Sequence, residues 1–236
     1  MFETNVLNIC IVPTTRTPEA TRERLLNAAA QLFAESGFHG TTARDIAQRG
    51  GVNLAAGHYH FGSKKELYLE VLRAEFAKVR REMSRRRVIR SQTELDRLSR
   101  QELMDLLSTR TEVMMAMLVG PPPSLHSTLM QREMCDPSEA LPVIVAEFIE
   151  PMLDELKQVL QRLAPELDAA TIESCAFSMV GQALFYRFTM PAWLHMKNRG
   201  SYPRDLARTA AAHITEFSLG GLDRLAAQRH RRQRAK

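Results

Sequence analysis

The sequence has few cysteines and no long apolar run, and both absences narrow what the chain can be. Cys10, Cys135 and Cys175 are far apart and form no Cys-x-x-Cys pair, so neither a disulfide framework nor a structural zinc site is expected. No run approaches the ~18 apolar residues of a membrane-spanning helix. The opening residues carry Glu3 and no positively charged leading segment, unlike a signal peptide. We therefore expect a soluble, cytoplasmic protein with no membrane partner.

The sequence also lacks any grouping of residues that would support catalysis or metal binding. It contains no Gly-x-Ser-x-Gly motif and no Cys/His arrangement in the context that a nucleophilic enzyme needs. His58 and His60 are two residues apart, which places them on different faces of a helix, and no Cys, Asp or Glu joins them at a ligand spacing. We expect no enzymatic activity, no metal and no cofactor.

Charge is distributed unevenly along the chain. Residues 1–90 carry a net charge of +6 (15 basic, 9 acidic), residues 91–222 carry −6 (11 basic, 17 acidic) and residues 223–236 carry +5 (6 basic, 1 acidic). Blocks of opposite sign indicate modules with different partners. The basic front suits a polyanion, which the acidic middle would repel. A merely solvated charged surface is the plain alternative for the front block.

Apolar periodicity predicts helices and no strand of useful length. Pro151 is expected to kink one of these helices, and Gly220-Gly221 to end the last. The predicted helices span residues 19–37, 43–49, 54–60, 64–90, 103–118, 125–134, 138–163, 168–190 and 204–219. The expected fold is all-α, with a small three-helix head joined to a larger helical bundle.

The second and third predicted helices have the layout of a helix-turn-helix. Thr42 and Asn53 stand where N-caps are needed, and Gly50-Gly51 supply the turn. Such a unit inserts one end of its second helix into the ~12 Å major groove. Residues 53–56 are expected to face base edges, and the flanking polar and basic side chains to reach phosphates. The candidate DNA-binding residues are Thr42, Arg44, Asn53, Leu54, Ala55, Ala56, His58, Tyr59, His60, Lys64 and Lys65.

Several of the residues just described have a plainer interpretation. Phe61 is expected in the core, whereas Tyr59 suits core packing and a DNA contact equally well. The arginine-rich runs at 85–87 and 230–234 are expected to be solvated helix ends or tails, with a phosphate-gripping arm as the alternative for the second.

A methionine cluster and a group of polar-tipped side chains are the candidates for ligand binding. Met114, Met115 and Met117 either fill the core or line a pliable cavity for apolar ligands. The group near residues 182–195, which includes His195, either packs in a dimer or orients an effector. The candidate ligand-binding residues are Met114, Met117, Gln182, Tyr186, Arg187 and Trp193.

Residues 20–66 resemble the N-terminal domain of TetR-family transcriptional regulators. The shared motifs are A-x-x-L-F-x-x-x-G-F (Ala29 to Phe38), T-T-x-x-x-I-A (Thr41 to Ala47), G-V-N, and Y-H-F-G-S-K-x-x-L (Tyr59 to Leu67). Most of that family has an aromatic phosphate contact where this chain has His58, and an aliphatic residue where it has Gly57. The C-terminal part resembles the CecR-like branch at Arg132-Glu133, Pro137-Ser138, Ile149-Glu150-Pro151 and residues 181–187.

The resemblance implies a nine- or ten-helix homodimer, paired through its last long helices, with a ligand cavity in the bundle. We expect a ligand-responsive regulator, more specifically a repressor that a small-molecule effector releases from a pseudo-palindromic operator in double-stranded DNA. The alternative, motivated by Gly57-His58, is an all-α ligand-binding or scaffold protein with a degenerate DNA-binding head. The expected organisation is a flexible arm (1–18), a helix-turn-helix domain (19–66), a ligand-binding and dimerisation domain (67–222) and a basic tail (223–236).

Overall fold

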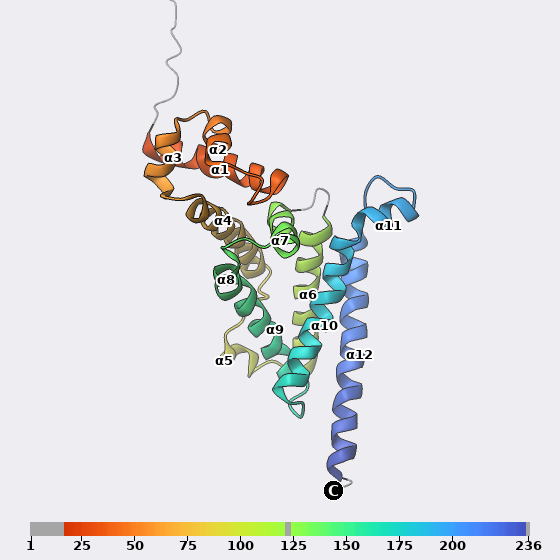
Figure 1. Ribbon diagram of the computed structural model, residues 1–236. Coiled ribbons are helices and arrows are strands. Elements are labelled where there is room, and N and C mark those ends of the chain that lie inside the picture. The colour runs from red at the N-terminus through yellow and green to blue at the C-terminus, as the bar shows by residue number, and fades with distance from the viewer. Residues whose placement is uncertain (1–16, 121–123, 235–236) are drawn as a thin grey trace, which may run out of the picture.

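Helices make up all the regular secondary structure in the described parts of the chain, which confirms the all-α class (Figure 1). The computed structural model describes residues 17–120 and 124–234, without the side chains of residues 56–58 and 232–234. The elements are α1 (Pro18–Ser36), α2 (Ala43–Arg49), α3 (Leu54–Phe61), α4 (Lys64–Arg85), α5 (Gln92–Leu95), α6 (Arg100–Val119), α7 (Leu125–Cys135), α8 (Leu141–Ile144), the π-helical turn η1 (Val145–Ile149), α9 (Glu150–Leu163), α10 (Ala169–Phe188), α11 (Met190–Met196) and α12 (Leu206–Arg234). No helix in these parts is long and apolar enough to cross a membrane. The predicted flexible arm lies almost wholly outside the described residues.

The head consists of α1 to α3, packed on the first half of α4. Short polar side chains start its helices: Thr17 caps α1, Thr42 forms a capping box with Asp45 on α2, and Ser63 caps α4. Apolar residues of α1 to α4 pack against one another and form the core of the head. The same core cluster takes in Leu129 of α7. The head core therefore extends onto α7, while the rest of the bundle has a separate core of its own.

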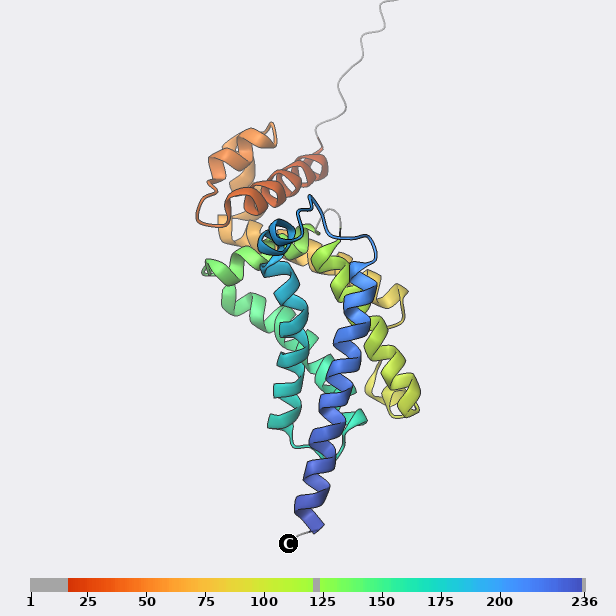
Figure 2. The same cartoon turned by 90° about the vertical axis from the view of Figure 1, so that its right-hand side faces the viewer.

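The bundle is built around α6, α9, α10 and α12. Its core includes the fully buried Met115, so the core interpretation is confirmed for this member of the methionine cluster. Figure 2 shows α10 and α12 side by side along one face of the molecule, with no other helix covering them. The bundle thus leaves one face formed by two long helices exposed.

Pro151 divides the long helix expected over residues 138–163. The structure has the short α8, then the wider turn η1, and then α9 with Pro151 near its start. Proline has no N–H to donate and its ring would clash with the carbonyl four residues earlier. A π-helical turn at this place relieves both problems, so the expected disturbance is local and the chain continues as helix.

The expected end of the last helix at Gly220-Gly221 is wrong. Helix α12 continues to Arg234, and the stretch predicted as a basic tail forms its final turns as far as that residue. Each glycine costs about 1 kcal/mol in a helix relative to alanine. Burial of Leu222 and Ala226 against the bundle offsets that cost. Two ion pairs also hold α12 to the bundle. Asp223 pairs with Arg100, and Arg229 pairs with Asp168.

Candidate DNA-reading head and effector cavity

The turn between α2 and α3 has the geometry that a helix-turn-helix requires. Gly51 has φ of +62°, a left-handed conformation that favours glycine. The Val52 N–H then donates to the Ala47 carbonyl at 3.0 Å, and the Val52 side chain packs against the head core. The Asn53 Oδ1 accepts from the Ala55 N–H at 2.6 Å and caps α3. The caps predicted at Thr42 and Asn53 are confirmed.

Helix α3 presents an exposed side to solvent and buries its far end. Tyr59 is 84% exposed and Leu54 42% exposed, and Ala55 is exposed with them. Phe61 is only 8% exposed and belongs to the head core, as predicted. The core alternative for Tyr59 is therefore wrong. The predicted contacts of Ala56 and His58 concern side chains outside the described part and stay predictions.

The candidate phosphate-binding residues differ in whether their side chains already have partners within the protein. Lys64 donates to the carbonyl oxygens of Phe38 and Thr41 at 3.0 and 3.1 Å, and its ammonium lies 4.1 Å from the centre of the Phe38 ring. Lys64 thus joins the start of α4 to the loop before α2. Arg44 and Lys65 form no ion pair with any described residue, so their charges are available to an external anion.

Two further head residues have local partners. The Thr42 hydroxyl donates to Asp45 Oδ2 at 2.6 Å and accepts from the Asp45 N–H at 3.2 Å. The donation from the Thr42 hydroxyl, together with that from the Thr42 N–H to the same oxygen at 3.1 Å, lowers the pKa of the Asp45 carboxyl. His60 is partly buried and packs edge-on against the Tyr59 ring, with centroids 5.2 Å apart. His60 therefore orients the exposed Tyr59 ring and remains next to the proposed DNA surface.

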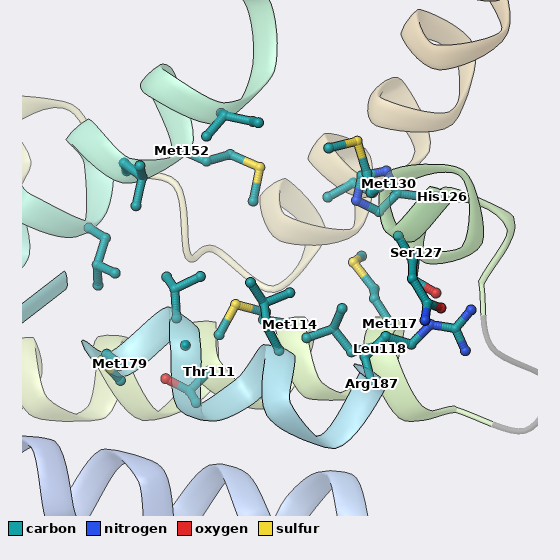
Figure 3. Close-up of a pocket in the computed structure, with 18 of the residues that line it drawn as sticks. Thr111, Met114, Met117, Leu118, His126, Ser127, Met130, Met152, Met179 and Arg187 are labelled. Carbon is teal, nitrogen blue, oxygen red and sulfur yellow. The ribbon is translucent and has the colours of Figure 1, made fainter. Parts of the chain in front are cut away.

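A cavity of about 380 Å³ lies in the bundle, bordered by α4, α6, α7, α9 and α10 (Figure 3). Its walls are mostly apolar, and Figure 3 shows thioether side chains entering it from several helices. The methionines that line it are Met83, Met114, Met117, Met130, Met134, Met152 and Met179. Met134 and Phe188 are also exposed at the surface, which gives a ligand a route in. An apolar, pliable pocket of this size is typical of small-molecule sites.

The predicted ligand-binding residues divide into two groups of three. Met114, Met117 and Arg187 line the cavity. The other three lie elsewhere: Gln182 contacts Ser178 and Ser218, the Tyr186 carbonyl accepts from the Tyr202 hydroxyl, and Trp193 packs edge-on against the Tyr202 ring.

Sequence reasoning missed several polar residues of the cavity, among them Arg110 and His126. Burial lowers the pKa of His126 to about 4, so the ring is neutral near pH 7. Its Nδ1 is buried without a hydrogen-bond partner. No sequence signal would have found either residue, because a lone histidine or arginine in an amphipathic helix has no characteristic neighbours.

Helix α7 contacts both the cavity and the head. His126 and Met130 line the cavity from this helix. Arg132 donates to two carbonyl oxygens in the last turn of α1. Glu133, only 1% exposed, accepts from the Tyr68 hydroxyl of α4 at 2.9 Å. Helix α7 is therefore joined to the head by two polar contacts.

The chain thus combines a helix-turn-helix head with a helical bundle that contains an apolar cavity. This combination is typical of ligand-responsive helix-turn-helix regulators. Residues 25–71 match the family described as bacterial regulatory proteins, tetR family. Residues 102–222 match the C-terminal domain of the HTH-type transcriptional dual regulator CecR. The chain belongs to the TetR family of bacterial regulatory proteins and has a CecR-type C-terminal domain.

Individual relatives agree with this assignment. The chain is 43% identical to the HTH-type transcriptional repressor KstR2 of Mycolicibacterium smegmatis over 56 residues, 24% of this chain and 27% of that protein. It is 30% identical to the HTH-type transcriptional repressor AcnR of Corynebacterium efficiens over 102 residues, 43% and 53% of the two chains. The chain thus spans about a quarter to a half of these curated relatives.

Among solved structures, the fold is similar to that of the transcriptional regulator FadR from Bacillus subtilis in complex with stearoyl-CoA. The TM-score is 0.59 at 14% identity, and the match covers 84% of this chain and 98% of FadR. At this level of identity the similarity establishes the shared fold.

Proposed function

We propose that the protein is a homodimeric transcriptional repressor that a small-molecule effector releases from its operator. The observation that carries the proposal is that one helix, α7, both lines the cavity and holds the head. Occupancy of the cavity is thereby linked through α7 to α1 and α4, the helices on which α3 packs. The match to repressors over the head and the ligand named for FadR agree with this proposal.

The exposed side of α3 is the proposed reading surface. Leu54 and Ala55 offer methyl groups suited to thymine, and Tyr59 offers a hydroxyl and a ring edge. Arg44 and Lys65 supply phosphate contacts that fix the register of the head without reading sequence. Thr42 and Lys64 support this surface from within the head, and any phosphate contact they make is additional to that role.

The outer face of α10 and α12 is the proposed dimer interface. Phe185 is 65% exposed and Phe217 66% exposed, too much aromatic surface for a solvated face. Glycines four residues away on each helix leave the backbone open to close approach. The two stripes consist of Phe177, Gly181 and Phe185 on α10 and of Phe217, Gly221 and Leu225 on α12. A second copy packed here would carry two heads to successive major grooves, ~34–36 Å apart.

The proposed release step is a change in head spacing. An effector in the cavity would favour a position of α7 that carries α1 and α4 with it. Coupling energies in such systems are ~1–3 kcal/mol, which corresponds to a weakening of operator binding by about 5–150-fold.

A titration of labelled DNA from the region upstream of its own gene tests the proposal. We expect specific binding that falls steeply with salt concentration, because phosphate contacts dominate the affinity. Tyr59→Ala should reduce binding, whereas Tyr202→Phe, in the core of the bundle and not in the head, should leave it unchanged. Absence of specific binding, or an affinity independent of salt, would contradict the proposal and favour a degenerate head on a ligand-binding protein.

A further inference from the structure

Resting on the proposed function, we propose that the effector is an apolar carboxylic acid, whose carboxylate binds the guanidinium of Arg187 and whose apolar body fills the methionine-lined cavity. The proposal depends on the difference between the two arginines of the cavity.

Arg110 already has a counter-charge within the protein. Its Nη1 donates to Glu155 Oε2 at 3.1 Å, and its Nη2 donates to the Met152 carbonyl at 3.0 Å. Burial lowers the pKa of this guanidinium, and the neighbouring Glu155 carboxylate opposes only part of that shift. Glu155 also pairs with Arg80 at 3.2 Å, but the Arg80 side chain is 52% exposed and is solvated by water. Arg110 therefore keeps a counter-charge within the protein.

Arg187 has no counter-charge among the described residues. It is 9% exposed, its Nη2 donates to the Thr128 hydroxyl at 3.0 Å, and its Nη1 has only the Met190 sulfur at 4.0 Å. Its Nε is buried with no hydrogen-bond partner. The end of α10 provides a partial negative charge nearby, but a partial charge does not replace a carboxylate. A buried guanidinium left unpaired is costly and is expected to attract an anion.

The surroundings of Arg187 strengthen this expectation. No acidic residue lines the described cavity. Figure 3 places Arg187 at the same end of the cavity as Ser127 and His126, with Thr111 and Met179 at the other end. A ligand with one charged end and a long apolar body matches that division. Carboxylate geometry suits the guanidinium fork, which can donate two parallel hydrogen bonds.

The volume sets the size of the ligand. A cavity of about 380 Å³ holds roughly a dozen groups of the size of water, at ~30 Å³ each. Decanoate, with ten carbons and one carboxylate, is therefore a suitable probe. Decanol and decyltrimethylammonium have the same chain with a neutral and a cationic head.

Calorimetric titration of the full-length protein with these three probes tests the proposal without DNA. We expect decanoate to bind at least tenfold more tightly than decanol, and the cationic probe to bind more weakly than either. In Arg187→Met, decanoate should lose at least tenfold in affinity while decanol retains its own. Arg187→Lys should keep part of the preference for the acid, and Arg199→Met, an exposed arginine after α11, should keep all of it.

Equal binding of decanoate and decanol by the unmodified protein would overturn the proposal, as would binding of none of the probes. The same holds if Arg187→Met folds and keeps the preference for the acid. The head-group series on the unmodified protein decides the matter even if that variant fails to fold. If decanoate binds selectively but never alters DNA binding, the proposed release by such an effector fails while the assignment of the anion-binding cavity stands. Absence of specific DNA binding, by contrast, would refute the proposed repressor function.

Discussion

Replacing Tyr68 by phenylalanine should destabilise the protein measurably, because the Tyr68 hydroxyl is one half of the buried contact between α4 and α7. Tyr68 is 2% exposed and Glu133 is 1% exposed, and their oxygens are 2.9 Å apart. Burial and the nearby Glu133 carboxylate raise the pKa of the Tyr68 hydroxyl, which therefore stays protonated and donates. The other oxygen of Glu133 accepts from the N–H and hydroxyl of Ser138, at 2.9 and 3.0 Å.

The expected cost of Tyr68→Phe follows from these contacts. The substitution leaves Glu133 Oε2 buried without a donor, and a hydrogen bond to a charged group is worth about 1.5–3 kcal/mol. For a chain of this size, each kcal/mol corresponds to a fall in Tm of about 2–4 °C. We expect a loss of about 1.5–3 kcal/mol in the free energy of unfolding, and weaker coupling between the cavity and the head.

Urea denaturation followed by circular dichroism measures this loss. Tyr59→Phe is the matched control, since it removes the same hydroxyl from a residue that is 84% exposed. It should change the free energy of unfolding by less than about 0.5 kcal/mol. If both variants lose equally little, the α4–α7 contact does not stabilise the protein and the proposed route from cavity to head loses its main support.

Three other predictions address the head, the dimer and the cavity. Lys65→Ala should weaken binding to all DNA sequences alike and reduce the salt slope by about one unit, whereas Lys64→Ala should also lower the stability of the head, measured by thermal denaturation. Phe217→Glu should convert the dimer to a monomer in light scattering, because it buries a charge in the proposed apolar interface; an unchanged dimer would exclude this face. His126 has a pKa of about 4 in the folded chain against ~6.5 in the unfolded chain. As the pH falls, the unfolded state therefore takes up the proton first. The free energy of unfolding is expected to fall between pH 6.5 and 4, by about 3 kcal/mol in all. His126→Phe should remove that part of the fall, and the exposed His195→Gln should not; identical pH profiles of the variant and the unmodified protein would refute the assignment.

The local sequence was sufficient to identify the head. Thr42, Asn53 and Ser63 are short polar residues that cap helices through contacts only two or three residues away. Gly51 supplies a left-handed turn that depends on its own backbone alone. Because each of these signals acts within a few residues, the bounds of α2 were predicted correctly and those of α3 to within one residue.

The cavity and the end of α12 were decided by contacts between distant parts of the chain. Glycine propensity favoured an end at Gly220, yet burial of Leu222 against the bundle outweighed it. The sequence indicated Arg187 as a ligand-binding candidate and missed Arg110, but it could not show which of the two has a counter-charge within the protein. Only the packed structure places Glu155 beside Arg110 and, among the described residues, no carboxylate beside Arg187. Capping and turn formation are short-range effects that the sequence encodes directly. Desolvation and charge pairing depend on which helices meet, and the tertiary structure alone determines that.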